Sequence, residues 1–304
     1  MIAIGLINYN CELDILRCVE SIETTIDCEY KVYIVDNKSG QDSIDFLLNN
    51  YKLNNRVEII LLDQNYGYSR ANNEAIKSAK TDGFKQIIIS NSDIIFLRHA
   101  IKVMYQRLLE NDDIVIVGPK IYYRNLSTVQ HSTRLKEQTL LEVMGLSKSM
   151  KSLDEDNLIE SKIVYSVSGC CFAVNINKFE SIDYFDEEVF LYNEENIISF
   201  KSAKSGLITL FEPKACVVHN HGSTTGINNM FVNKEYIKSS IYYWYYYKNK
   251  RKISLYIFKW FLVSKWLIKS LYTKSMRKKW LTFFRETRIS AITKKRNKFG
   301  IKYK

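Results

Sequence analysis

The sequence lacks the residues and spacings that mark several large classes of protein. Only two of its 304 residues are proline and eleven are glycine, so we expect no long flexible linker. None of the six cysteines forms a C-x-x-C pair, and no zinc-ligand spacing occurs. We therefore interpret the cysteines as small buried apolar residues of a protein in the reducing cytosol.

Targeting, membrane-spanning and phosphate-loop signals are missing as well. Residues 1–7 have no basic leader and predict a strand rather than an export signal. Lys259 and Lys265 interrupt the best spanning candidate, so no uncharged run approaches the ~20 residues that a bilayer requires. No G-x-G-x-x-G follows the first strand, and G-x-x-x-x-G-K-[ST] does not occur. These absences disfavour dinucleotide oxidoreductases, P-loop kinases and ATPases.

Acidic residues are nearly absent from the C-terminal part of the chain. Residues 234–304 contain 21 Lys or Arg but only Glu235 and Glu286 as acids, for a net charge of +19, whereas residues 1–233 carry −8. The same segment holds all four tryptophans. A basic, aromatic segment favours an anionic surface, and we expect a membrane because no nucleic-acid module is visible. We therefore predict one domain at 1–233 and a helical, membrane-associating extension at 234–304.

Short apolar runs alternate with helix-like stretches over the first 120 residues. This alternation predicts an α/β fold, with a mostly parallel sheet and helices on both faces. The expected strands are 2–7, 30–35, 57–62, 86–90, 114–117, 165–174 and 209–218. The expected helices are 13–24, 43–51, 69–80, 100–110 and 197–205.

Several local features refine this prediction. Ser69 is expected to cap the third helix. Gly118-Pro119 is expected to close the fifth strand, and Pro213 to break the last one. Residues 120–160 are expected to form an irregular insertion over the sheet edge, because they are polar and weakly periodic.

A buried strand at 86–90 ends on the polar triplet Asn91-Ser92-Asp93. Ligands of open α/β sheets bind at the carboxyl ends of the strands. A divalent cation on a diphosphate needs one or two carboxylates besides phosphate oxygens and water, so Asp93 with Asn91 nearby fits a partial metal shell. The alternative is that Asp93 is only a turn residue.

Two other strand ends and one expected strand interior carry amides or glycines. Asp36-Asn37 either accepts hydrogen bonds from a nucleotide base or ribose, or forms an Asx turn. Residues 65–67 and Asn72-Asn73 either line the same pocket or form a turn and a helix start. Gly169 is expected within a strand, where it lets backbone approach a ligand.

Two pairs of titratable residues follow further along the chain. Glu194 and Glu195 either complement a helix dipole or supply a base for a sugar hydroxyl. Neighbours differ by ~100° around a helix, so at most one of them points into a given site. His219 and His221 follow a strand, where they are structural, complete the metal shell or contact phosphate.

Together these elements resemble glycosyltransferase family 2, and within it a rhamnosyltransferase-like branch. The likeness spans about residues 3–225 and keeps the family's order of motifs. It rests on residues 7–10, 35–39, 65–73, 90–93, 168–171, 185–187, 190–195 and 219–223. The resemblance implies a Rossmann-like GT-A fold and inverting transfer from a nucleotide-diphosphate sugar with Mg²⁺ or Mn²⁺.

The resemblance also implies roles for single residues. Asp93 would bind the metal together with His219, and Glu195, or else Glu194, would be the base. Gly169, Tyr192 and His221 would contact acceptor or phosphate. The nucleotide would be held by Asn8, Asn10, Asp36, Asn37, Asn65, Gly67, Asn72 and Asn91.

The C-terminal extension contains a further helical pattern. Ile253, Ile257 and Trp260 recur at helical spacing, with Lys252 and Lys259 on the other side of the wheel. Such a helix either lies in the membrane interface or packs on the catalytic domain. By family analogy we expect a lipid-linked saccharide acceptor in bacterial surface-polysaccharide synthesis, of the capsule or O-antigen kind. The enzyme would then be cytoplasmic and peripheral at the inner face of the membrane.

Two other readings stay open. A sugar nucleotidyltransferase would need a glycine-rich N-terminal loop with Arg and Lys, which Gly5 alone does not supply. A degenerate transferase serving as a membrane-bound scaffold is supported only by Ile197, which stands where the family commonly has an acid, and is opposed by Asp93 and Glu195. Rhamnose, galactofuranose, galactose and glucose donors are all compatible with the motifs.

Overall fold

The computed structural model describes residues 1–147, 153–220, 230–270 and 280–294. The chain forms two compact units that interleave along the sequence. The first contains Met1–Glu137, Ser152–Glu187 and Ile198–Thr224. The second contains Gln138–Lys151, Glu188–Ile197 and Thr225–Lys304, so the units are not two consecutive segments of the chain.

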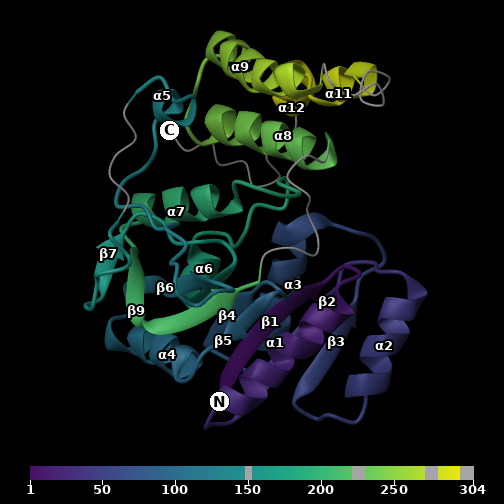
Figure 1. The fold of residues 1–304 in the computed structure, drawn as a ribbon, viewed down its shortest axis with the longest axis vertical. Helices are drawn as coiled ribbons and strands as arrows, with labels where there is room; N and C mark the ends of the chain where they lie inside the picture. The colour runs from purple at the N-terminus through teal and green to yellow at the C-terminus, as the bar shows by residue number, and fades with distance from the viewer. Residues whose placement is uncertain (148–152, 221–229, 271–279, 295–304) are drawn as a thin grey trace. The chain divides into compact units, whose positions relative to one another are not determined.

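The first unit is built on a nine-stranded sheet (Figure 1). Its main path runs in the order β3-β2-β1-β4-β8-β6-β9-β5, and β7 pairs with β9. The strands β1 to β4 pair in parallel, as does β6 with β9, whereas β5, β7 and β8 run antiparallel to their neighbours. The strands are β1 (Ile2–Asn8), β2 (Tyr30–Asp36), β3 (Val57–Leu61), β4 (Gln86–Ser90), β5 (Ile94–Phe96), β6 (Ile114–Tyr123), β7 (Lys162–Val164), β8 (Cys171–Asn175) and β9 (Ile208–His219).

Helices cover both faces of this sheet, as the sequence predicts. The helices α1 (Glu12–Thr25), α2 (Gln41–Tyr51) and α4 (Ala100–Glu110) pack on one face, around Ile4 and Leu6. The helices α3 (Gly67–Thr81) and α6 (Ile176–Ser181) pack on the other, around Ala3. Successive strand residues point to opposite faces, so one buried strand serves both cores. The expected α/β class is therefore confirmed.

The prediction for the middle of the chain was wrong at both prolines. Gly118-Pro119 does not end a strand, because β6 continues to Tyr123, and β9 runs through Pro213 without a break. Between Pro119 and the next residue of β6, the partner on β9 jumps from Glu212 to Cys216. Proline cannot donate to a ladder and is tolerated at such irregularities. The chain's two prolines thus lie at one shared bulge, where two strands bend together.

Other boundaries also differ from the sequence prediction. The expected strand at 165–174 begins only at Cys171, as β8, because β7 ends at Val164 and Gly169 lies in the connection between the two strands. Both β5 and α6 are short elements that periodicity did not indicate. Ser69 does not cap α3, which begins at Gly67 with Tyr66 as its N-cap, and the buried Ser69 Oγ has no partner. The insertion at 120–160 contains the short helix α5 (Leu140–Val143).

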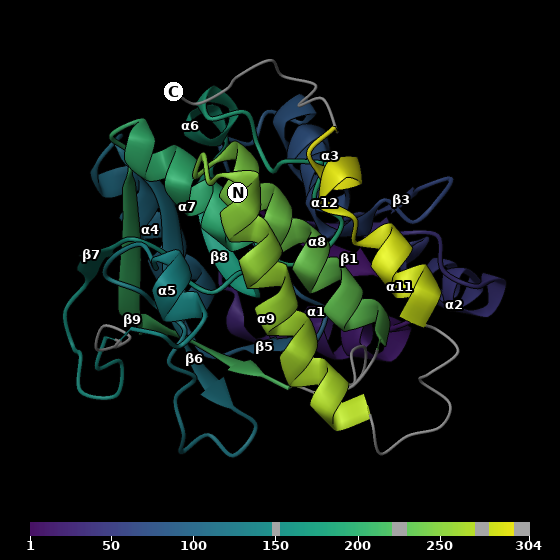
Figure 2. The same cartoon turned by 90° about the horizontal axis from the view of Figure 1, so that it is seen from above.

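The second unit is mainly helical. It contains α5, α8 (Met230–Tyr246), α9 (Lys252–Ser270), α11 (Trp280–Glu286) and α12 (Ile289–Ile292), and α7 (Glu194–Lys204) begins in it. In Figure 2, α8 and α9 run side by side. Within the described part of the chain, no helix is both long and apolar enough to cross a membrane.

The orientation of α9 differs from its helical-wheel prediction. Leu255, Phe258 and Val263 are buried, whereas Ile257 and Trp260 are exposed. Lys259, expected to face solvent, is buried and donates from Nζ to the carbonyl of Thr287 at 2.7 Å. The wheel could not distinguish two competing apolar faces, and contacts with α8 and α12 decide which one is packed.

The tight packing around Gly118 of β6 gives a test of the bulged region. A Cβ at Gly118 would lie 2.5 Å from Cβ and Cγ1 of Val167. We therefore expect Gly118→Ala to lower the free energy of unfolding by about 1–3 kcal/mol through overpacking. Urea denaturation followed by circular dichroism measures this loss.

The paired variant gives the control. Val167→Gly removes Cβ, Cγ1 and Cγ2, the three atoms that a Cβ at Gly118 would meet, so the double variant should be less destabilised than the sum of the two single variants. Strict additivity would show that the overlap is relieved by movement elsewhere.

Candidate functional site

The carboxyl ends of β1 and β2 are joined by a buried cluster of hydrogen bonds. Asn8 Nδ2 donates to Asp36 Oδ2 at 2.7 Å and to the hydroxyls of Ser39 and Ser43 at 3.0 Å each. The backbone N–H of Ser39 donates to Asp36 Oδ1 at 2.9 Å, so the Asp36 carboxylate closes a turn three residues on, one residue longer than the Asx turn that the sequence analysis considered. Asn8 and Asp36 are fully buried. Their first role is therefore to hold the loop after β2, and nucleotide contact by Asp36 stays a prediction.

Asn10 links this loop to the one after β1. Its backbone has φ = 53°, its Oδ1 accepts from the N–H of Gly40 at 2.7 Å, and its own N–H donates to Ser39 Oγ at 3.0 Å. Asn is among the few residues that enter the left-handed region readily. The side chain of Asn10 thus bridges two loops at the sheet edge.

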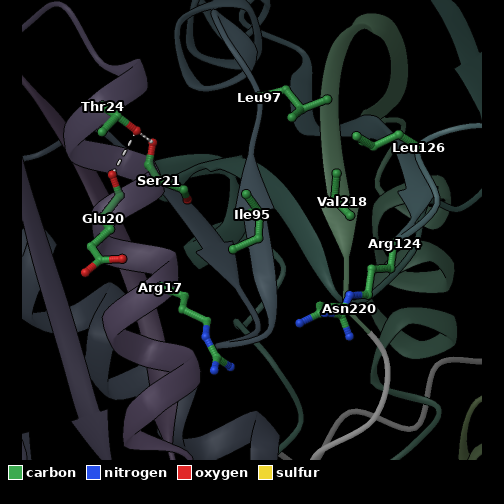
Figure 3. Close-up of a pocket in the computed structure, with 10 residues that line it drawn as sticks. All are labelled: Arg17, Glu20, Ser21, Thr24, Ile95, Leu97, Arg124, Leu126, Val218 and Asn220. Carbon is green, nitrogen blue, oxygen red and sulfur yellow. Dashed lines mark hydrogen bonds between the residues drawn. The ribbon is translucent and has the colours of Figure 1, made fainter.

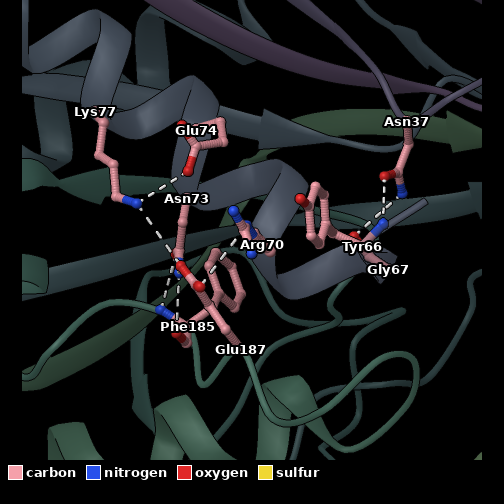
Figure 4. Close-up of polar contacts among 9 residues, drawn as sticks. All are labelled: Asn37, Tyr66, Gly67, Arg70, Asn73, Glu74, Lys77, Phe185 and Glu187. Carbon is pink, nitrogen blue, oxygen red and sulfur yellow. Dashed lines mark hydrogen bonds and ion pairs between the residues drawn. The ribbon is translucent and has the colours of Figure 1, made fainter. Parts of the chain in front are cut away.

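Asn37 ties the end of β2 to the start of α3 (Figure 4). Its Oδ1 accepts from the N–H of Tyr66 at 2.9 Å, and its Nδ2 donates to the carbonyl of Gly67 at 3.2 Å. Gly67, at φ = 82°, also donates its N–H to Asn65 Oδ1 at 3.0 Å. The turn reading of residues 65–67 is therefore observed, and the structure brings Asn37, Asn65 and Gly67 together.

Asn72 and Asn73, neighbours on α3, have different surroundings. Asn73 exchanges two hydrogen bonds with the backbone of Phe185, at 3.0 and 3.1 Å, and donates to Glu187 at 3.0 Å (Figure 4). Asn72 is fully buried and donates to the carbonyl of Tyr68 at 3.2 Å, but its Oδ1 has no partner. Buried polar atoms without partners are uncommon, so the Asn72 carbonyl, like the Ser69 hydroxyl on the same helix, is a group still open to a ligand or water.

The turn before Glu187 is held by a buried lysine. Asp183 and Tyr184 both have positive φ, and Lys201 Nζ donates to their carbonyls at 3.0 and 2.8 Å. Burial lowers the pKa of Lys201 to about 8. On the other side, Glu187 meets Arg70 and Lys77 of α3 at 4.0 and 3.7 Å. The segment that resembles a family motif at 185–187 is thus fixed to α3 by charge and by amide pairing.

Asp93 and His219 are brought together at the same sheet edge. The pairing of β5 with β9 sets Ile94 opposite His219, and the carboxylate Oδ1 of Asp93 lies 3.3 Å from His219 Nε2. The N–H of Asn220 donates to the Asp93 carbonyl at 2.9 Å, and the N–H of Asn91 to the Cys170 carbonyl at 2.8 Å. These contacts place the expected metal ligands in one cluster.

Two residues that the sequence analysis did not single out surround His219. Its Nδ1 lies 3.3 Å from Gln130 Oε1, and Cys170 contacts the ring. Burial alone would lower the pKa of His219, but hydrogen bonding to Asp93 and Cys170 raises it to about 10. Gln130 lies in a polar stretch without periodicity, so no sequence signal pointed to it, and Cys170 had been interpreted as apolar filling.

The Asp93–His219 pair suits a divalent cation that also binds substrate oxygens. The two side chains are 14% and 9% exposed, so they are partly shielded but reachable. Cations of this kind commonly take one or two protein ligands and fill the shell with phosphate oxygens and water. No group of three His, Cys, Asp or Glu side chains capable of holding a metal alone occurs among the described residues. A shared site of this type therefore fits the residues present.

Gly169 lies in the connection before β8. Its carbonyl accepts from the hydroxyl of Tyr68 at 2.7 Å. The Gly169 carbonyl is therefore a hydrogen-bond acceptor for Tyr68 of α3. Contact between Gly169 and a ligand stays a prediction.

A groove has a volume of about 720 Å³ (Figure 3). Some of its lining residues are near Asp93 and His219 in the sequence. Its volume lies within the range of small-molecule sites. In Figure 3 the apolar part of the lining includes Ile95 of β5 and Val218 of β9. Arg17 of α1 and Arg124 supply positive charge. The sequence analysis did not anticipate this groove, because its lining comes from four separate parts of the chain.

In the second unit, two consecutive left-handed residues precede α7. Tyr192 and Asn193 have φ of 70° and 65°, and Asn193 Nδ2 donates to the hydroxyls of Ser239 and Ser240 at 3.1 Å each. The ring of Tyr192 packs edge-on against that of Tyr236. These contacts fix the start of the helix that carries Glu194 and Glu195.

Of the two glutamates at the start of α7, Glu194 has a buried carboxylate oxygen. Glu194 Oε2 is buried without a partner. Burial, with the adjacent charge of Glu195 as a second cause, raises the pKa of Glu194 well above its usual value. Two adjacent carboxyl groups cannot both ionise easily, so Glu194 tends to keep its proton.

His221, expected to contact phosphate, lies outside the described residues.

Comparison with known proteins adds an independent finding. Residues 3–183 match the family model described as glycosyl transferase family 2. The curated hexosyltransferase Agl10 of low-salt glycan biosynthesis in Haloferax volcanii is 25% identical over 207 residues, which are 68% of this chain and 62% of the relative. The chain therefore spans less than two thirds of that relative's length.

Solved structures agree on the fold. The crystal structure of GalNAc-T7 with UDP, GalNAc and Mn²⁺ gives a TM-score of 0.64 at 18% identity, covering 81% of this chain and 48% of that one. The structure of S. aureus TarS 1–349 gives 0.54 at 14% identity, covering 96% and 82%. At these identities the likeness shows the fold alone, and it confirms the expected GT-A class. The rhamnosyltransferase-like branch stays a prediction.

The raised pKa of Glu194 predicts a pH-dependent stability. A carboxyl whose pKa is higher in the folded state contributes stability below its unfolded pKa and loses it as pH rises through the folded pKa. In the variant Glu194→Gln, the side chain at this position carries no charge at any pH. We therefore expect the variant to gain stability relative to the unmodified chain as pH rises from 5 to 9.

Urea midpoints at pH 5, 7 and 9 measure that difference. The control is Glu160→Gln, at an exposed glutamate, which should show no such trend. If the difference in urea midpoint between Glu194→Gln and the unmodified chain stayed constant from pH 5 to 9, burial of the Glu194 charge would not be unfavourable.

Proposed function

Because this chain belongs to glycosyl transferase family 2, we propose that it is an inverting glycosyltransferase acting on a nucleotide-diphosphate sugar. The observation that carries this proposal is the pairing of Asp93 with His219 at the carboxyl edge of the sheet. Such an edge is where open α/β sheets bind their ligands. We propose a hexose as the sugar, with rhamnose as the first candidate. The family match leaves no support for the nucleotidyltransferase reading.

The donor's nucleotide would lie over the loops that follow β1, β2 and β3. Asn8, Asn10 and Asp36 organise the first two loops, and Asn37 joins the second to the third. Because these loops are already hydrogen-bonded to one another, little ordering would be needed on binding. The open acceptor of Asn72 and the amide of Asn91 are the further groups proposed for the donor.

Asp93 and His219 are the residues that would hold Mg²⁺ or Mn²⁺. When bound there, the cation supplies positive charge against the diphosphate of the leaving nucleotide. Oε1 of Gln130 accepts a hydrogen bond from Nδ1 of His219. This contact orients Nε2 of the ring toward Asp93. Second contacts of this kind usually fix the tautomer of a metal-binding histidine.

Glu195 is the proposed base. It would accept the proton of the acceptor hydroxyl as that oxygen attacks the anomeric carbon from the face opposite the diphosphate, which inverts the configuration. Glu194 is the weaker candidate, because its raised pKa keeps it protonated at neutral pH more than an ordinary glutamate. The raised pKa of Glu194 supports the order that the family resemblance suggested.

A lipid-linked saccharide is the proposed acceptor, with Gly169, Tyr192 and His221 as contacts to it or to phosphate. The support is the charge of the segment at 234–304, whose net +19 suits an anionic membrane surface. We therefore propose a peripheral enzyme at the inner face of the membrane that works in surface-polysaccharide synthesis. A catalytically inactive scaffold is the competing reading, and the two experiments below separate them.

Removal of the proposed metal ligand should abolish donor turnover. We expect purified protein to release one nucleotide diphosphate from dTDP-rhamnose or from a common UDP-sugar only with Mg²⁺ or Mn²⁺. Asp93→Ala should lower that rate at least a hundredfold, because the diphosphate charge would lose its stabilisation. Chromatographic detection of the released nucleotide measures the effect.

The matched control is Asp112→Ala, which removes an exposed carboxylate from the turn after α4. It should leave metal-dependent release unchanged. Release that is equal with chelator, or equal in Asp93→Ala, would overturn the metal assignment. Donor binding without any release would favour the scaffold.

Removal of the proposed base should separate transfer from donor binding. We expect Glu195→Gln to lower kcat for transfer by about 10²–10⁴-fold and to leave donor affinity within a factor of three, since the amide cannot accept the proton. Steady-state kinetics with titration calorimetry of the donor measures both quantities. A larger loss in Glu194→Gln than in Glu195→Gln would reverse the assignment.

A further inference from the structure

Helix α9 exposes four large apolar side chains along one face. Ile253, Tyr256, Ile257 and Trp260 are 65%, 45%, 58% and 55% exposed. They stand three, four and seven residues apart, so they form one stripe, about 10 Å long, which we call the α9 stripe. Isolated exposed apolar residues are ordinary, but a contiguous group on one helix face indicates contact with another surface.

The opposite side of α9 is firmly packed. Leu255, Phe258 and Val263 are buried, and the buried ammonium of Lys259 donates to the Thr287 carbonyl at 2.7 Å. Turning the helix to bury the stripe would leave that lysine without its acceptor, which is costly for a buried charge. The stripe is therefore a fixed outward face of its unit.

The chemistry around the stripe favours an anionic partner. Lys250, Arg251 and Lys252 are exposed at its N-terminal end. The sequence contains no acidic residue between Glu235 and Glu286. Aromatic side chains such as Tyr and Trp favour the headgroup level of bilayers, and cations near them attract anionic lipids. The ring of Trp260 also packs at 5.7 Å from that of Phe284, which holds it in place on the stripe.

We propose that the α9 stripe is the surface through which the chain lies on an anionic lipid bilayer, with α9 in the plane of the interface. This deepens the membrane part of the proposed function and rests on it. It also changes the contacting residues, because Lys259 belongs to the interior and the flanking cations come from 250–252.

A second copy of the chain is a poorer occupant. Four side chains about half exposed offer roughly 400 Å² of apolar area. A stable interface buries about 800 Å² on each partner. A two-fold contact between stripes would also bring two sets of cations together without acids to neutralise them. A bilayer needs neither the larger area nor a matching surface.

Vesicle flotation of the full chain tests the proposal. We expect partition onto vesicles of equal phosphatidylglycerol and phosphatidylcholine, and at least tenfold weaker partition onto phosphatidylcholine alone. Ile257→Glu with Trp260→Glu should lower binding at least tenfold, because two charges would enter the interface. Arg251→Gln with Lys252→Gln should lower only the anionic-lipid preference, by about tenfold.

The matched control is Ile163→Glu, which alters an equally exposed isoleucine (65%) on β7 of the first unit. It should float as the unmodified chain does. Stripe variants that float normally would overturn the proposal. So would a chain that ignores vesicles but forms a dimer, by light scattering, that the stripe variants disrupt.

A solution assay separates this proposal from the enzymatic one. Donor hydrolysis without vesicles should be equal in the unmodified chain and in the stripe variants, which also shows that the variants are folded. Loss of hydrolysis in every form would defeat the proposed enzyme while leaving the flotation result intact. Normal hydrolysis with vesicle binding unaffected by the stripe variants would defeat only the stripe.

Discussion

The candidate site depends on the antiparallel pairing of β5 with β9. That pairing sets residues from two distant parts of the sequence opposite each other and leaves Asp93 beside His219. The strand β9 also pairs with β6 in parallel and with β7 in antiparallel fashion. Its position is therefore fixed from several sides. An edge strand held by one neighbour would place the imidazole far less firmly.

The shared bulge of β6 and β9 helps β9 to meet different partners along its length. The register shift at Pro119 and the residues skipped around Pro213 bend both strands at one place. Bulges sharpen twist and re-aim the residues that follow them. The prolines, which a sequence analysis takes as strand breakers, here lie where the sheet changes direction. The position of Asp93 and His219 at the sheet edge therefore depends on tightly packed apolar contacts, such as that of Gly118 with Val167.

Sequence patterns predicted the parallel half of the fold well, because its signals are local. The strands β1, β2 and β4 are continuous apolar runs, and α1 to α4 show clear helical spacing. The other half was harder, since β5 is three residues long and β8 depends on pairing with β4 and β6. Similarly, Asp93 could be singled out from a strand end. Gln130 could not, because its importance arises only from its distance to His219.

The arrangement of β9 also bears on how the chain is made. Ribosomes deliver the N-terminal residues first, so β1 to β4 and their helices can assemble while β9 is still unsynthesised. Until residue 219 emerges, β6 lacks its parallel partner along ten residues of backbone. An unpaired strand edge of that length is a template for association with other chains. The sheet edge that carries Asp93 and His219 is thus the last to be completed during synthesis, and the nascent chain is most exposed to aggregation in the interval before that edge forms.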